Sequence, residues 1–149
     1  MKTKMIMKTK YPSCQKGGAA IEFAIVLPLL LLLLFGIIEF SLLMYDKAVI
    51  TNASREGART AILFNDPVVG QGRATQADVT AVVGNYCSNN LISFGASDPV
   101  VTFPAWGGDT GQSRTVRVTY RYDFLFIPNV IPALSAGINL TAETIMRCE

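Results

Sequence analysis

The residues that could do chemistry are few in this sequence, and their types exclude most catalysis. The chain has 149 residues and contains no histidine, which excludes histidine-dependent hydrolysis, imidazole metal ligation and histidine pH switching. Its hydroxyl and thiol side chains stand in no nucleophile motif such as G-x-S-x-G. The glycine-rich segment 107–111 lacks the lysine and the following helix of a phosphate-binding loop. We therefore expect no enzyme, no cofactor and no metal.

The ionisable residue with the most unusual setting is Glu22, which stands at the start of a long apolar run. From Phe23 to Ile38, sixteen consecutive residues carry no charge. A carboxylate at the bilayer centre costs about 2–3 kcal/mol, so Glu22 either lies among lipid headgroups or has a partner. Two adjacent glycines, Gly17 and Gly18, precede it.

The apolar run predicts a membrane-spanning helix. Apolar character continues past Glu39 to Tyr45, and a helix from Ile21 to Tyr45 would be about 37 Å long, enough to cross a hydrocarbon core of ~30 Å. A cleaved secretory signal is the alternative, but its apolar region would span only ~7–15 residues and end in an A-x-A-like site. The sequence leaves open whether Glu39 has a partner within the membrane.

The charge distribution predicts the orientation of this helix. Residues 1–17 carry five lysines and no acidic residue, whereas the rest of the chain has eight basic and eleven acidic residues. By the positive-inside rule the N-terminus lies in the cytoplasm and the chain after Tyr45 is extracytoplasmic. The same lysines could resemble a nucleic-acid-binding tail, but beside a membrane helix they are topology determinants.

The stretch from Lys16 to Phe40, KGGAAIEFAIVLPLLLLLLFGIIEF, resembles the TadE-like pseudopilin family, and the segment NASREGARTA extends the resemblance to about residue 62. The resemblance implies that a prepilin peptidase cuts between Gly17 and Gly18, on the cytoplasmic side, so that Glu22 becomes the fifth residue of the mature chain. It further implies that the Glu22 carboxylate pairs with the α-amino group of a neighbouring subunit. Pro28 is similar to the proline that kinks the stem helix of pilins, or is merely tolerated there.

The resemblance implies a minor pseudopilin with a structural role in assembling a tight-adherence (Flp, type IVb-like) pilus or a related secretion apparatus. Its partners would be the prepilin peptidase, other pilins or pseudopilins and the assembly platform of the bacterial inner membrane. The protein would cross that membrane once, with its C-terminal domain in the periplasm. The alternative function is an uncleaved, signal-anchored extracytoplasmic binding module.

The residues after the membrane predict an α+β, pilin-like fold. We expect a cleaved leader at 1–17, a transmembrane helix at 18–45, a continuation of this stem helix at 46–64 and a small α/β domain at 65–149. The continuation has an apolar arc with a ridge of small residues, Ala53, Gly57 and Ala61, which would pack on the domain's own sheet or on another subunit.

The domain itself shows one helical and several strand patterns. Thr75 and Asp78 form a plausible capping pair for a second helix that ends at Asn89 and Asn90. Strands are expected at 100–103, at 115–122 and in the last residues from 138, with a loop or hairpin at 106–113 and Glu143 opposite Arg117 or Arg121. The apolar segment 125–134 would fold over the sheet edge or form a contact surface.

The three cysteines, Cys14, Cys87 and Cys148, form no metal-binding cluster. Cys14 lies in the cytoplasmic leader, whereas the other two face an oxidising periplasm and share apolar faces of their predicted elements. We therefore predict a Cys87–Cys148 disulfide, and the alternative is two buried free thiols.

Overall fold

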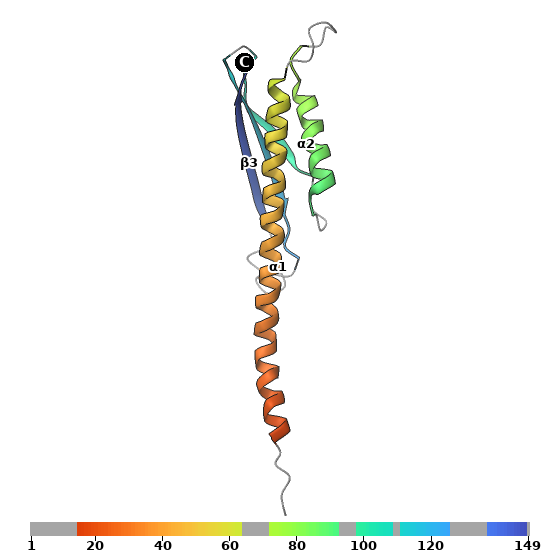
Figure 1. Ribbon diagram of the computed structural model, residues 1–149, viewed down its shortest axis with the longest axis vertical. Helices are drawn as coiled ribbons and strands as arrows, with labels where there is room; N and C mark the ends of the chain where they lie inside the picture. The colour runs from red at the N-terminus through yellow and green to blue at the C-terminus, as the bar shows by residue number, and fades with distance from the viewer. Residues whose placement is uncertain (1–14, 64–71, 93–97, 109–110, 126–136, 149) are drawn as a thin grey trace, which may run out of the picture. The chain divides into compact units, whose positions relative to one another are not determined.

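A computed structural model of the chain describes residues 15–63, 72–92, 98–108, 111–125 and 137–148. Within these ranges, two helices are followed by three strands (Figure 1): α1 (Gln15–Ile62), α2 (Gln76–Asn90), β1 (Val100–Trp106), β2 (Ser113–Tyr122) and β3 (Ile138–Arg147). The strands form an antiparallel sheet in the order β1-β2-β3. The predicted α+β, pilin-like fold is confirmed.

Helix α1 has 48 residues, which corresponds to about 72 Å at 1.5 Å per residue. It continues through Pro28 without a break. The chain divides into two compact units, residues 1–35 and 36–149. In the first unit the described apolar side chains of α1 are almost all exposed, whereas in the second unit α1 buries one face against the sheet and α2.

The phase of the central strand β2 follows the sequence prediction. Val116, Val118, Tyr120 and Tyr122 are buried, and the alternate residues lie on the other face of the sheet. Arg117 is paired with Glu143 in the register of β2 and β3, and their side chains form a salt bridge at 2.6 Å. The predicted cross-strand contact of Glu143 is therefore confirmed for Arg117.

Strand β1 is longer than the sequence predicts. It runs to Trp106 because a β-bulge between Thr102 and Ala105 accommodates Pro104. A bulge inserts an extra residue and changes the phase of the residues that follow, so Phe103 and Trp106 both pack toward the core. Their rings meet edge to face, with centroids 4.8 Å apart. The sequence predicts that this strand ends at Phe103, because Pro104 lacks a ladder donor, and that the glycine-rich residues from Trp106 form a loop or hairpin.

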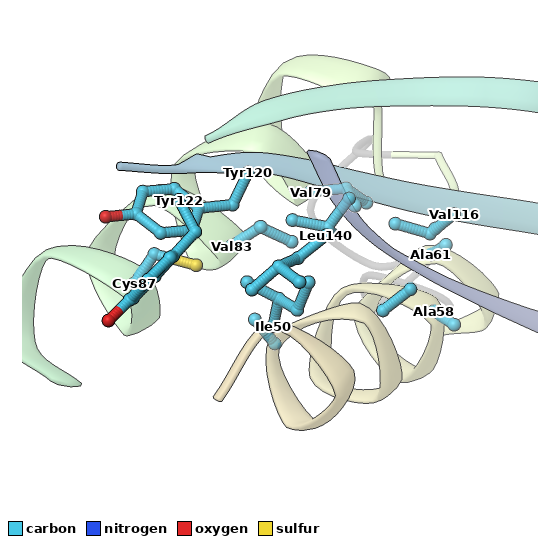
Figure 2. Close-up of a cluster of buried hydrophobic side chains, with 13 residues drawn as sticks. Ile50, Ala58, Ala61, Val79, Val83, Cys87, Val116, Tyr120, Tyr122 and Leu140 are labelled. Atoms are coloured by element: carbon cyan, nitrogen blue, oxygen red, sulfur yellow. The ribbon is translucent and has the colours of Figure 1, made fainter. Parts of the chain in front are cut away.

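The core lies where the sheet meets α1 and α2 (Figure 2). At Gly57, the backbone of α1 lies close to side chains of α2 and β2. A Cβ added there would lie 2.6 Å from Val83, 3.3 Å from Val79 and 3.3 Å from Val116. The small-residue ridge of the stem therefore packs within its own domain, which was the first of the two alternatives. Ala58, which the sequence pattern did not single out, is buried beside the ridge.

Helix α2 begins with the predicted cap. The Asp78 backbone N–H donates to the Thr75 hydroxyl at 3.3 Å, and the Asp78 carboxylate accepts from the Thr75 backbone N–H at 2.8 Å. This reciprocal capping box satisfies donors that have no partner within the helix. The hydrogen bonds to its carboxylate lower the pKa of Asp78. The predicted apolar face packs inward through Val79, Val83 and Cys87.

The predicted Cys87–Cys148 disulfide is not formed in this structure, where both thiols are free and buried. The Cys148 backbone N–H donates to the Gln112 carbonyl beside the start of β2. Cys87 lies in the last turn of α2. Just after this helix, the Ile92 N–H donates to Asp46 of α1, so Cys87 lies near that part of the stem. The cysteines therefore lie toward opposite ends of the sheet, whereas a bridge needs Cα atoms ~4.4–6.8 Å apart. Burial raises the pKa of the Cys87 thiol to about 11.

Several expectations concern residues outside the described ranges. These are the leader with Cys14, the chain between the two helices at 64–71 and most of the apolar segment 125–134.

Candidate processing and assembly site

The predicted cleavage residues lie in the first turn of α1. Gly17 and Gly18 are exposed, and a Cβ added at either position would have no heavy atom within 4 Å. The first helical turn contains no acidic residue, and each glycine disfavours helix by about 1 kcal/mol relative to alanine. The first N–H groups of a helix also have no partner within it. This turn can therefore unwind into an extended strand at little cost.

Glu22 follows one turn later and projects from the same exposed helix. In the part of the chain that the structure describes, no hydrogen bond or ion pair involves its carboxylate. Its neighbours Ile21 and Phe23 are exposed and apolar. A charged group beside such a surface is stable in contact with water, headgroups or a cationic partner. The geometry thus leaves Glu22 accessible to an intermolecular partner.

Glu39 is the opposite case, a fully buried carboxylate that is satisfied within its own domain. The Tyr122 hydroxyl donates to Glu39 Oε1 at 2.9 Å, and the backbone N–H of Leu125 donates to the same oxygen at 2.8 Å. Burial and this hydrogen bond raise the pKa of Tyr122, so its phenol stays protonated and continues to donate. The structure thereby supplies the partner for Glu39 that the sequence left open.

Asp46 lies on the same face two helical turns further along α1 and is also fully buried. Its Oδ1 accepts from the Ile92 backbone N–H at 3.1 Å, whereas its Oδ2 has no hydrogen-bond partner among the described residues. Burial raises the pKa of this carboxyl group, and the hydrogen bond from Ile92 opposes the shift. Asp46 therefore fixes the end of α2 onto the stem through one oxygen, while the other carries a desolvation penalty.

Arg114 occupies the other end of the domain, where α1 ends. Its Nη1 donates to the carbonyls of Ala61 at 2.5 Å and Ala74 at 3.1 Å, and its Nε donates to the Gly107 carbonyl at 2.8 Å. The guanidinium also stacks on Trp106, 4.3 Å from the ring centroid. A cation at a helix C-terminus is favoured by the helix dipole. This buried arginine joins the stem, the start of α2 and the hairpin between β1 and β2.

Sequence reasoning selected Gly17, Gly18 and Glu22 and missed the buried charges of the domain. An acidic residue within an apolar run, as at Glu39, signals a specific partner, but nothing in the sequence identifies Tyr122. Arg114 is in phase with the buried Val116, whereas Arg117 and Arg121 lie on the other face of β2. The alternation could have indicated this burial, but the predicted strand begins at Thr115 and so excludes Arg114. Among the described residues, no group of three or more side chains could hold a metal ion.

Comparison with known proteins supports the resemblance over the stem. Residues 17–59 match the family model described as TadE-like protein, and this range contains Gly17, Gly18, Glu22 and Glu39. Residues 17–59 therefore resemble the TadE-like family, as the sequence predicts. No curated protein and no solved structure matches the chain. Helix α1 is long and apolar enough to cross a membrane, which fits a single-pass membrane protein.

Proposed function

We propose that this protein is a minor pseudopilin of a tight-adherence pilus or a related secretion apparatus. The observation that carries the proposal is the match of residues 17–59 to the TadE-like family, in which the glycine pair and Glu22 stand at the expected spacing. In this role the chain crosses the inner membrane once, with its N-terminus in the cytoplasm and its domain in the periplasm. Its work is structural rather than enzymatic.

Processing is the first step of the proposed function. A prepilin peptidase binds the chain extended across Gly17 and Gly18 and hydrolyses the bond between them. The two glycines suit this step because they unwind easily and present no side chain to the enzyme. The product begins at Gly18 and carries a new α-amino group four residues before Glu22.

Assembly follows from the new N-terminus. The Glu22 carboxylate of one subunit pairs with the α-amino group of a neighbouring pilin or pseudopilin, and the assembly platform of the inner membrane brings the subunits together. In a low-dielectric bundle, each charge offsets the cost of burying the other. Its exposure and the lack of an intramolecular partner in the described residues keep Glu22 available for this contact.

Substitutions at two positions, Gly17 and Glu22, test the proposal in cells that produce the pilus. Gly17→Val should block processing, because a branched side chain crowds the extended backbone in the peptidase. Glu22→Ala should leave membrane insertion and processing intact but reduce the number of pili, and Glu22→Gln should do the same because it removes the charge while keeping the size. Normal piliation in both Glu22 variants would contradict an assembly role for this carboxylate.

A further inference from the structure

The part of α1 that belongs to the domain has two unlike faces. One face packs on the sheet and α2 and includes the buried carboxylates Glu39 and Asp46. The opposite face carries exposed apolar side chains in its first turns: Phe40 is 62% exposed, Met44 45% and Tyr45 46%. With Ile37, these residues repeat at the spacing of three and four that defines one helical face.

The apolar face ends abruptly one turn further along. After the exposed Ala48, the positions on this side become polar or charged and remain largely exposed, and they are Thr51, Asn52, Arg55, Glu56 and Arg59. A face of a membrane helix that changes from apolar to polar within one turn, and to charged within the next, is typical of a lipid–water boundary. Aromatic side chains such as Phe40 and Tyr45 are favoured at that boundary.

The serine hydroxyl on this apolar face is satisfied within the helix. Ser41 lies between Phe40 and Met44, and its hydroxyl donates to the Ile37 carbonyl at 2.7 Å. A side chain that returns its donor to its own helix is compatible with hydrocarbon, where no water is available. The large side chains here also differ from the small residues that allow close contact between helices.

We propose that this outer face of α1, from Ile37 to Tyr45, contacts lipid, so that the base of the domain is immersed in the outer half of the bilayer. On the domain side, protein covers the helix from Glu39 onward, because Tyr122 and Leu125 bind the carboxylate there. On the opposite side, lipid continues to Tyr45, six residues or about 9 Å further along the axis. Lipid therefore reaches further along α1 on its outer side than on the side that faces the domain.

This arrangement gives the Glu39 contact a second role beyond stability. A carboxylate at this depth would be costly if it faced lipid, and the Tyr122 hydroxyl and the Leu125 N–H replace the water it has lost. The domain thus shields the only acidic residue between Phe23 and Tyr45. The inference rests on α1 crossing a membrane, as proposed above, but not on pilus assembly.

Lipid quenching of a fluorophore tests the inference on the full chain in vesicles of phosphatidylethanolamine and phosphatidylglycerol. Single cysteines are introduced as Leu31→Cys, Met44→Cys and Arg55→Cys in a Cys14→Ser background and labelled with bimane. Cys87 and Cys148 are buried, and the unsubstituted background gives the blank. Spin-labelled lipids with the nitroxide near the headgroup report labels at the membrane surface, and lipids with the nitroxide near the middle of the acyl chain report the Leu31 label.

The Met44 label should be quenched at least about twofold more strongly than the Arg55 label, which lies about 16 Å further along the same face. Quenching at residue 44 no stronger than at residue 55 overturns the inference. Cross-linking of Met44→Cys to a second copy in dilute vesicles also overturns it, because another subunit then covers the face. If the Leu31 label is not quenched by the mid-chain nitroxide either, α1 does not span the bilayer, which overturns the proposed function as well.

Discussion

The two halves of α1 form one continuous helix but differ in what buries them. In the first unit, the described part of the stem exposes nearly every apolar side chain. In the second unit, the helix buries a stripe that runs from Glu39 to Ala61. The described residues of the chain therefore leave the first half uncovered, whereas they bury one face of the second half. Substitutions in the two halves should accordingly have different readouts.

The largest effect on the free energy of unfolding is expected at Gly57, in the second half of α1. Gly57→Leu would introduce a Cβ only 2.6 Å from the Val83 side chain, so we expect the free energy of unfolding to fall by about 3 kcal/mol. Chemical denaturation in detergent, followed by the fluorescence of the single tryptophan, measures this change.

Gly36 provides the matched control for this substitution. A Cβ added at Gly36 has no heavy atom within 4 Å, so Gly36→Leu should leave stability unchanged or raise it by up to about 1 kcal/mol through helix propensity. Equal losses at the two positions would mean that the loss at Gly57 does not come from its contact with Val83.

The next effect concerns the buried cation at the end of the stem. Arg114→Met should lower the free energy of unfolding by about 2 kcal/mol, because it leaves three carbonyl groups without their donor. The same substitution at Arg117, whose salt bridge to Glu143 is largely exposed, should change it by less than about 1 kcal/mol. A similar loss in both variants would contradict the role assigned to Arg114.

A smaller effect on stability should distinguish Glu39 from Glu22. Tyr122→Phe removes a donor to Oε1 of Glu39 and leaves the Leu125 N–H in place, so it should reduce stability by about 1–2 kcal/mol. Tyr86→Phe, at a partly buried tyrosine on α2, serves as the control and should be nearly neutral. Glu22→Ala should leave the same unfolding curve unchanged while it reduces piliation, and a loss of stability there would remove the distinction between the two glutamates.

The smallest effect should be a pH dependence of the folding stability that is caused by Asp46. Because burial raises its pKa above the ordinary 3.8, the folded state holds its proton more tightly than the unfolded state. Stability is then highest below pH 3.8, falls as the pH rises through the raised value and is constant above it. Asp46→Asn should abolish this decline and be more stable than the parent at pH 7 by about 1 kcal/mol. Parallel stability curves for parent and variant across the acidic and neutral range would contradict this interpretation.

The sequence predicted the elements whose signals are local. The capping pair Thr75–Asp78, the alternation of β2 and the apolar arc around Gly57 are short-range patterns, and the structure confirms all three. These patterns determine which face of an element is buried. They also sufficed to place Glu143 opposite one of two arginines.

The features that the sequence did not predict depend on contacts between distant residues. Glu39 and Tyr122 are 83 positions apart, and the carbonyl partners of Arg114 follow from where α1 ends against the sheet. The two domain cysteines share apolar faces as predicted, but periodicity gives no position along the sheet. The extension of β1 past Pro104 required a bulge, which no local propensity indicates.

The central claim is that this chain is a processed pseudopilin, and its intact mass tests that claim most directly. The protein is purified from membranes of cells with and without a prepilin peptidase and is measured by mass spectrometry, with Gly17→Val as the uncleavable control. We expect full-length chain without the peptidase, a chain that begins at Gly18 with it, and full-length Gly17→Val in both. A chain that remains uncleaved in the presence of the peptidase, or that begins at any residue other than Gly18, would contradict the claim.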